Sequence, residues 1–257
     1  MKIYDYQKEL YDLYISGDIH GEFRTLVYNI KRLKIKDAVI IVAGDCGIGF
    51  EKIGHYEQLY RKINKTLDTN NCILLLIRGN HDDPGYFEEE LIDFPRMKTI
   101  PDYSILKVAS RTVLCIGGAI SLDRYDRLHE MEMRRIKRKS EISIYWENEY
   151  PVYKESEIQL ISEMEISIDT VVTHTAPSFC YPQAKSNFAK RVINDPDLEK
   201  DIANERQIFS DIYYSLKRNN HEIKDWMYGH FHSSHTEFID GVRFSLLDIE
   251  ELKEPLN

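Results

Sequence analysis

Seven side chains that commonly bind metal ions follow short apolar runs of this sequence, each close to the point where a run ends. They comprise two carboxylates, one amide and four imidazoles: Asp18, His20, Asp45, Asn80, His174, His230 and His232. Oxygen and nitrogen donors together suit a divalent transition metal such as Mn, Fe, Co, Ni or Zn. Seven ligands exceed what one ion needs, so the set predicts two ions that share one carboxylate.

The local spacing favours the same interpretation. Asp18 and His20 are two residues apart, as are His230 and His232, and on a strand this spacing places both side chains of a pair on one face. A glycine stands directly before Asp18, Asp45, Asn80 and His230, which lets the backbone turn sharply there. Each motif alone is more typical of a turn, a helix start or an interior histidine. Their occurrence together indicates a metal site.

The elements that position these side chains follow from the hydrophobic pattern. Apolar runs, most of them rich in Val, Ile or Leu, predict buried strands at residues 13–16, 38–43, 72–77, 113–116, 170–173 and 226–228. Residues 22–33 and 51–67 repeat apolar positions with helical spacing. This alternation predicts an α/β sheet with crossover helices, in which ligands bind at the carboxyl ends of the strands.

The second half of the chain is less regular. Residues 123–150 are polar and contain a basic run from Arg134 to Lys139. Asp195 followed by Pro196 predicts a helix start, with Asp195 as the N-cap. Residues 235–249 alternate and predict a hairpin that turns at Asp240-Gly241. We place these later strands in a second sheet.

Length and composition limit the class of protein. The chain has 257 residues, a formal net charge of −9 and 42% hydrophobic residues, which is typical of one globular domain and argues against a binder of long nucleic acid. We expect a single domain over residues 1–257 with an insertion at about 121–150. No run approaches the roughly 18 apolar residues that span a bilayer. The widely spaced Cys46, Cys72, Cys115 and Cys180 suggest buried reduced thiols and a cytoplasmic location.

The motif order resembles the calcineurin-like metallophosphoesterases, particularly small bacterial and phage members. The family pattern of Asp-x-His, Gly-Asp, Gly-Asn-His-Asp/Glu, a lone His and Gly-His-x-His is complete over residues 17–232. The resemblance implies a four-layer α/β/β/α sandwich of two mixed sheets flanked by helices, with two divalent ions, for which we favour Mn, between the sheets. By position, one ion would be held by Asp18, His20, Asp45 and His232. The other would be held by Asp45, Asn80, His174 and His230.

One block departs from many family members. After Gly44-Asp45 the sequence lacks the second aspartate of Gly-Asp-x-x-Asp and the arginine that follows it in relatives of protein phosphatases. This departure weakens an assignment as a phosphoprotein phosphatase, although the first block, Gly-Asp-Ile-His-Gly-Glu, looks like that branch.

The expected reaction is hydrolysis of a small phosphoester by in-line attack of a hydroxide that bridges the two ions. His81 follows the ligand Asn80 directly and, as in the family, would act as general acid or transition-state stabiliser, with Asp82 orienting it or pairing with it. Arg78, Arg124 and Arg127 are candidates for binding phosphate, and each could instead be an ordinary surface or salt-bridge residue.

Two further features bear on the substrate. The basic run is either a solvated helix face or a patch for a polyanion. Phe179, Tyr181 and Phe188 either cover the core or stack on a base. We favour a nucleotide-like phosphodiester or phosphomonoester as substrate. A phosphoprotein phosphatase, a diadenosine-polyphosphate-type hydrolase and a binding scaffold without activity are the alternatives.

Overall fold

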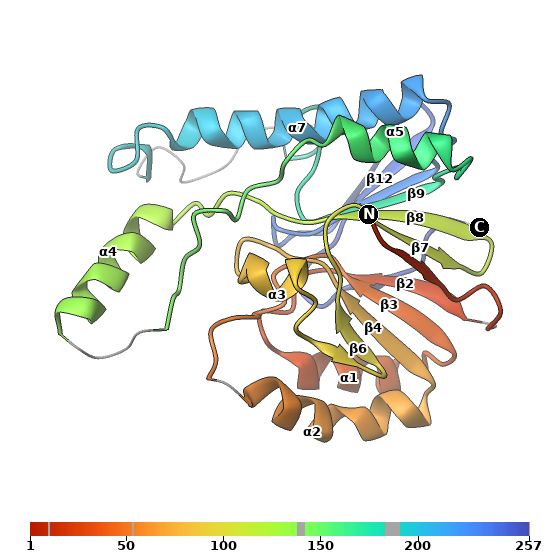
Figure 1. The fold of residues 1–257 in the computed structure, drawn as a ribbon, viewed down its shortest axis with the longest axis horizontal. Helices are drawn as coiled ribbons and strands as arrows, with labels where there is room; N and C mark the ends of the chain where they lie inside the picture. The colour runs from red at the N-terminus through yellow and green to blue at the C-terminus, as the bar shows by residue number, and fades with distance from the viewer. Residues whose placement is uncertain (10, 53, 138–141, 183–190, 257) are drawn as a thin grey trace.

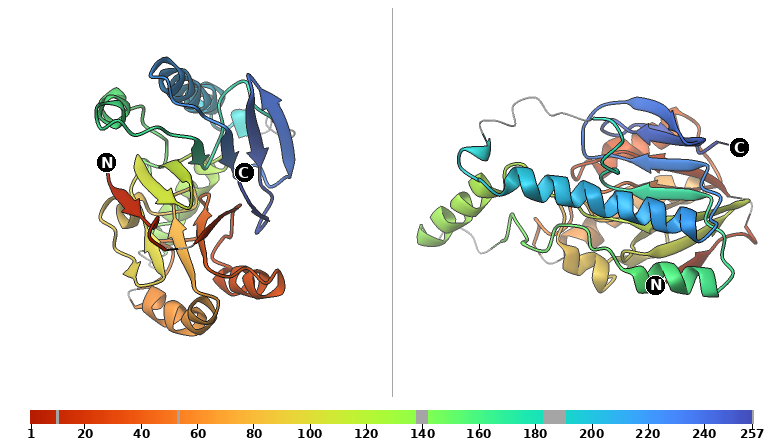
Figure 2. Two further views of the ribbon diagram at one scale, coloured as in Figure 1. Left: turned by 90° about the vertical axis from the view of Figure 1, so that its right-hand side faces the viewer. Right: turned by 90° about the horizontal axis from the view of Figure 1, so that it is seen from above.

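The structure is a computed structural model that describes residues 1–9, 11–52, 54–137, 142–182 and 191–256. Two sheets are stacked face to face, and helices cover both outer surfaces (Figure 1). A view from the side shows the same stack of helices, sheet, sheet and helices (Figure 2). The expected four-layer sandwich of two mixed sheets is therefore confirmed.

The six-stranded sheet is built mainly from the first 100 residues. Four neighbouring strands in its centre are parallel, and a short antiparallel strand closes each edge. In spatial order the strands are β13 (Leu252–Lys253), β2 (Asp12–Ser16), β3 (Ala38–Val42), β4 (Cys72–Leu76), β6 (Met97–Thr99) and β5 (Asp93–Phe94).

The seven-stranded sheet holds most of the later strands, as expected. Strands β8, β9, β10 and β12 are parallel, whereas β7 pairs with β8 and β11 pairs with β12 in antiparallel fashion. The spatial order is β1 (Ile3–Asp5), β7 (Ser104–Val108), β8 (Arg111–Ile116), β9 (Thr170–Thr173), β10 (Asp225–Tyr228), β12 (Val242–Leu246) and β11 (His235–Ile239).

Helices cover the sheets on their outer faces. Figure 1 shows α1 (Phe23–Arg32) and α2 (His55–Thr69) beneath the six-stranded sheet, and α5 (Glu155–Glu163) and α7 (Leu198–Arg218) above the seven-stranded sheet. The short α3 (Pro84–Glu88) and α4 (Arg124–Ile136) lie towards one edge, where α4 stands apart from the sandwich. The expected insertion at 121–150 contains α4.

The strands are apolar on both faces because each face packs against a different layer. In β3, Ile40 and Val42 join the core under α1 and α2, while Val39 and Ile41 join the core between the sheets. In β10 the neighbours of Met227 face α7, whereas Met227 itself faces the other sheet. Successive residues of these strands therefore alternate between the helix layer and the other sheet, although all of them are buried. This is typical of sheets that are covered on both faces.

Most predicted elements are confirmed, with one correction. The helices expected at 22–33 and 51–67 are α1 and α2, and the hairpin turns at Asp240-Gly241 between β11 and β12. The N-cap of α7 is Asp197, not Asp195. The Asp195 carboxylate instead accepts hydrogen bonds from Arg124, 2.5 Å from its Nε and 2.9 Å from its Nη2. In the described part of the chain, no helix combines the length and apolarity needed to cross a membrane.

Candidate metal centre

Loops that follow five strands bring the seven predicted side chains to one edge of the sandwich. Because β2, β3 and β4 are parallel in one sheet and β9 and β10 are parallel in the other, their carboxyl ends meet at this edge. His174 Nε2 lies 3.1 Å from both Asp45 Oδ1 and Asn80 Oδ1. The His174 and His230 ring centroids are 5.0 Å apart. This half of the set is largely buried, since His174 is inaccessible to solvent.

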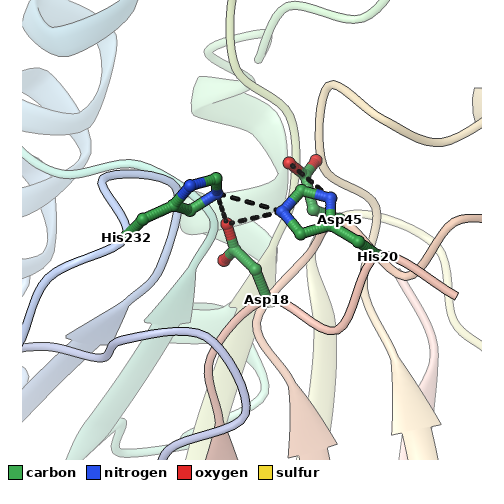
Figure 3. Close-up of side chains that lie close together, drawn as sticks. All are labelled: Asp18, His20, Asp45 and His232. Carbon is green, nitrogen blue, oxygen red and sulfur yellow. Dashed lines mark hydrogen bonds and ion pairs between the residues drawn. The ribbon is translucent and has the colours of Figure 1, made fainter. Parts of the chain in front are cut away.

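The other half of the set forms a compact cluster (Figure 3). One ligand atom from each of Asp18, His20, Asp45 and His232 can be chosen so that all four lie within 4.8 Å of one another. His232 Nε2 lies 3.0 Å from Asp18 Oδ2 and 3.0 Å from His20 Nε2. His20 Nδ1 lies 3.9 Å from Asp45 Oδ2. The carboxylates are buried, whereas the two imidazoles remain partly open to solvent.

The backbone at these residues is held in an uncommon conformation. His20, Asp45, His230 and His232 have φ angles of 44°, 47°, 69° and 47°. The left-handed backbone conformation costs a non-glycine residue roughly 1–2 kcal/mol. Such strain at four of seven residues that converge on one point is typical of a functional site.

Glycine is required where the chain passes closest to the cluster. Gly44 has a φ of 91°, and a Cβ atom there would lie 2.2 Å from His174 Nδ1. A Cβ atom at Gly229 would lie 2.1 Å from Asp18 Oδ1. Any other residue at either position would displace one of the predicted ligands.

The donor atoms fit a divalent cation. Asp18 Oδ2 is buried without a hydrogen bond of good geometry, and its neighbours are imidazole nitrogens of His232 at 3.0 Å and His20 at 3.9 Å. The other oxygen of Asp18 accepts a hydrogen bond from the His230 backbone N–H at 2.9 Å, which orients the carboxylate. An orphaned buried oxygen that faces two imidazoles is an arrangement that a shared cation would complete.

Electrostatic coupling inside the cluster is strong. Burial disfavours charge on both Asp45 and His174, yet their mutual attraction lowers the pKa of Asp45 and raises the pKa of His174 to about 10. The His174 ring is fixed by its Nδ1, which lies 2.7 Å from the Ala43 carbonyl oxygen. This hydrogen bond leaves Nε2 facing Asp45 and Asn80, as expected of a metal-binding histidine with an anchored second nitrogen.

His81 lies beside the cluster and contacts an arginine of α4. Its ring centroid is 5.2 Å from that of His20, and its backbone N–H donates to Asp45 Oδ1 at 2.7 Å. Arg127 Nη2 lies 2.8 Å from His81 Nδ1. Burial lowers the pKa of His81, and the positive charge of Arg127 lowers it further. Of the three arginines considered from the sequence, Arg127 is the one in contact with His81.

Asp82 joins two loops of the site through backbone hydrogen bonds. Its two carboxylate oxygens accept three backbone hydrogen bonds, from Cys46 at 3.0 Å, Ile48 at 2.8 Å and Gly79 at 2.7 Å. Asp82 is fully buried, and burial raises its pKa to about 7. It therefore ties the loop after β3 to the loop after β4, and its role in orienting His81 stays a prediction.

Arg78 and Arg124 are engaged in structural contacts. Arg78 is 4% exposed and donates to Asp102 Oδ2 at 2.7 Å and to the backbone oxygens of Glu149 and Tyr150 at 2.7 and 3.1 Å. Arg124 pairs with Asp195 and with Asp201, the latter at 2.7 Å. These contacts explain both arginines without a phosphate, and phosphate binding by Arg78 and Arg124 stays a prediction. Both guanidinium groups already face carboxylates.

Two residues that the sequence reasoning missed hold Asn80. The Asn80 Nδ2 donates to Ser121 Oγ at 3.1 Å, and the Ser121 hydroxyl and backbone N–H both donate to the Glu149 carboxylate at 2.6 Å. Because the amide nitrogen points at Ser121, the amide oxygen faces His174. Ser121 precedes the polar stretch at 123–150 by two residues, but no local signal marks Glu149, which is 28 residues away from Ser121.

A cleft of about 460 Å³ opens on this cluster. Tyr181 and Arg191 are among the residues that line it. Phe179 packs instead against Tyr213 and Phe244, with ring centroids 5.1 and 5.6 Å apart, and so belongs to the core. Phe188, Arg138 and Lys139 lie outside the described residues.

The described part of the basic run belongs to α4 and its C-terminal end. Arg134 pairs with Glu130 one helical turn away at 2.5 Å, and Arg135 is exposed. One of the described charges is therefore already neutralised within the helix.

Comparison with known proteins identifies the family. A model of the calcineurin-like phosphoesterases matches residues 12–234, and no curated protein sequence matches the chain. Similar solved structures include GAP50, the anchor in the inner membrane complex of Plasmodium, with 14% identity over 92% of this chain and 71% of that one at a TM-score of 0.47. A dimetal phosphatase from Danio rerio has 11% identity over 94% and 88% of the two chains at a TM-score of 0.47.

A putative 5′-nucleotidase from Staphylococcus aureus has 14% identity over 92% of this chain and 48% of that one, at a TM-score of 0.43. None of these three structural similarities reaches a TM-score of 0.5, so the family assignment rests on the family model. That model spans all five motif blocks. The chain thus belongs to the calcineurin-like phosphoesterase family and is a metal-dependent hydrolase of phosphoester bonds.

Proposed function

We propose that this protein is a phosphoesterase with two divalent metal ions that hydrolyses a nucleotide-like phosphodiester or phosphomonoester. The observation that carries the proposal is the convergence of Asp18, His20, Asp45 and His232, whose ligand atoms lie within 4.8 Å of one another beside a cleft of about 460 Å³. His174 lies next to the same Asp45 carboxylate, and Asn80 and His230 lie next to His174.

Asp45 is the residue best placed to be shared by two ions. Its Oδ2 faces His20, and its Oδ1 faces His174. We therefore propose that Asp18, His20, Asp45 and His232 hold one ion, and that Asp45, Asn80, His174 and His230 hold the other. Mixed oxygen and imidazole donors suit Mn, Fe, Co, Ni or Zn, and we propose Mn²⁺ as the native ion.

When bound, a pair of such ions supplies a hydroxide nucleophile near neutral pH and neutralises charge on the phosphoryl oxygens. The chain itself provides the proton donor. His81 lines the cleft next to Asn80, and we propose that it gives a proton to the leaving oxygen. Arg127 contacts this imidazole and also pairs with Asp123 at 2.9 Å. Arg127 Nη2 also contacts the second ring nitrogen, Nε2, and thereby fixes the position of the His81 ring.

A nucleotide-like substrate fits the lining of the cleft. Tyr181 is 40% exposed and offers a ring face on which a base can stack, while Arg191 offers a positive charge. An acidic chain without the second aspartate and the arginine of the Gly-Asp block is less suited to phosphoproteins as substrates.

We further propose that the chain forms one domain with an insertion at 121–150. We also propose a cytoplasmic location, which is supported by four buried free thiols.

The proposal is tested by removing metal with a chelator, restoring Mn²⁺, and assaying p-nitrophenyl phosphate and bis(p-nitrophenyl) phosphate. We expect two ions per chain and turnover of at least one ester. Asp45→Asn should lose both metal and activity. If the wild type fails to bind metal ions, or hydrolyses neither ester with Mn, Fe, Co, Ni or Zn, the result would instead support a binding scaffold without activity.

The role of His81 is tested separately. We expect His81→Ala to keep its metal content while its turnover falls about 10²–10⁴-fold, because proton transfer to the leaving oxygen is lost. His129→Ala, on the exposed face of α4, is the matched control. Full activity in a metal-replete His81→Ala protein would remove this role.

A further inference from the structure

Two clefts lined by described residues open onto the metal ligands. The first has a volume of about 460 Å³ and reaches Asp45, Asn80, His230 and His232; we call it the Tyr181 cleft. The second has a volume of about 370 Å³ and reaches His20; we call it the Phe50 cleft. His81 lines both. His232 lines the Tyr181 cleft and His20 lines the Phe50 cleft, and Figure 3 shows these two imidazoles on either side of the Asp18 carboxylate.

The Tyr181 cleft combines apolar surface with a positive charge. Its walls include Leu122, Tyr181 and Phe231. Arg191 is the one arginine or lysine that lines it among the described residues, and no ion-pair partner of its guanidinium lies within them. Asp123 also lines the cleft, but its carboxylate is paired with Arg127 at 2.9 Å. The cleft therefore favours a substituent with a ring and a negative charge.

The Phe50 cleft lacks a counterpart of Arg191. It is lined by Phe50, Tyr56 and Leu59 together with Glu22 and Glu51, and no described lysine or arginine lines it. Glu51 lies 3.5 Å from His55, which also lines this cleft, whereas Glu22 has no described ion-pair partner. The Glu22 carboxylate repels a second phosphate and no arginine or lysine attracts one, whereas the apolar side chains accept an uncharged group. Its volume falls in the range of sites that hold small ligands.

We propose that the substrate is a phosphodiester that lies across the metal ligands, with a ring-bearing, negatively charged substituent in the Tyr181 cleft and an uncharged substituent in the Phe50 cleft. This inference rests on the proposed function. A monoester has one substituent and would leave one cleft to water. In the diester reaction, water oxygen bonds to phosphorus, one ester P–O bond breaks, and the leaving oxygen takes a proton. His81 lies between the clefts and is within reach of either substituent.

The experiment narrows each cleft in turn. Leu59→Trp fills part of the Phe50 cleft, Leu122→Trp fills part of the Tyr181 cleft, and Leu160→Trp on the outer helix α5 is the matched control. Mn²⁺-loaded proteins are assayed on bis(p-nitrophenyl) phosphate, and metal content and Tm are measured for each variant. We expect kcat/KM for the diester to fall at least about tenfold in both cleft variants and to stay unchanged in the control. A loss in one cleft variant only, with both folded and metal-replete, would overturn the proposal.

Charge is tested with two dinucleotides. Dithymidine monophosphate and its 5′-phosphorylated form differ by a phosphate on one substituent. We expect the phosphorylated form to have a KM about tenfold lower, and Arg191→Gln to abolish the difference, whereas Arg135→Gln on α4 should preserve it. Equal KM values for the two wild-type reactions would refute the role of Arg191.

The two proposals fail in different ways. If the wild type hydrolyses p-nitrophenyl phosphate but not bis(p-nitrophenyl) phosphate, the phosphoesterase function stands and the diester inference is wrong. If it hydrolyses neither ester with two metal ions bound, the proposed function itself fails.

Discussion

Ser121→Ala should weaken metal binding at the Asn80 side of the centre without touching a predicted ligand. Ser121 is fully buried, and its Oγ accepts from Asn80 Nδ2 at 3.1 Å and donates to Glu149 Oε2 at 2.6 Å. Removal of the hydroxyl leaves the amide nitrogen without this partner. The amide is then free to turn, so that its nitrogen rather than its oxygen faces His174.

The size of the effect follows from these contacts. A buried donor left unpaired costs about 1–3 kcal/mol. Loss of a residue that orients a metal ligand typically weakens metal affinity 10–100-fold. At about 1.4 kcal/mol per tenfold, this range corresponds to roughly 1.4–2.8 kcal/mol, so the two estimates agree. We expect the Kd of one ion to rise 10–100-fold and the Kd of the other to stay within about threefold of wild type.

Calorimetric titration of the metal-free protein with Mn²⁺ measures both affinities. Ser162→Ala is the matched control, since it also removes a serine hydroxyl, one that donates to the Ile158 carbonyl oxygen at 3.2 Å on α5. If both affinities are unchanged while Ser121→Ala lowers the free energy of unfolding, Ser121 is merely structural and the reasoning is refuted.

Three further outcomes are expected. Arg78→Ala should lower the free energy of unfolding by about 3–5 kcal/mol, measured by denaturant titration, because it leaves Asp102 without its buried partner; a rise in KM without loss of stability would contradict this. Burial raises the pKa of Glu149 from 4.5 to about 8, so the folded metal-free protein holds a proton that the unfolded chain releases. The free energy of unfolding of the metal-free protein should therefore decrease as the pH rises from 4.5 to 8, and Glu149→Gln should reduce this decrease. The same pH dependence in wild type and Glu149→Gln would contradict the prediction. A thiol reagent should label no cysteine of the native protein and four after unfolding, because every thiol is buried: Cys46, Cys72, Cys115 and Cys180; rapid labelling of the native protein would disprove the burial.

Local pattern determined which side chains could act and roughly where. The apolar runs at 38–43 and 72–77 are strands because both faces of β3 and β4 are buried, and Asp45 and Asn80 follow them within four residues. Proximity along the chain was enough for these assignments. Parallel pairing brings carboxyl ends together within each sheet, which made part of the convergence predictable, whereas the stacking of the two sheets joins the candidates of one sheet to those of the other.

Tertiary structure decided which charged neighbours serve the site. Arg78, Arg124 and Arg127 looked equivalent as motif-adjacent arginines, yet two of them pair with carboxylates at least 24 residues away and one reaches His81 across 46 residues. The Asp82 carboxylate likewise accepts hydrogen bonds from backbone N–H groups of the loop after β3. A partner is chosen by packing and desolvation between distant segments, and no local pattern encodes that choice. The same reason explains why the Ser121–Glu149 support of Asn80 and the second cleft beside His20 emerge from the folded molecule alone.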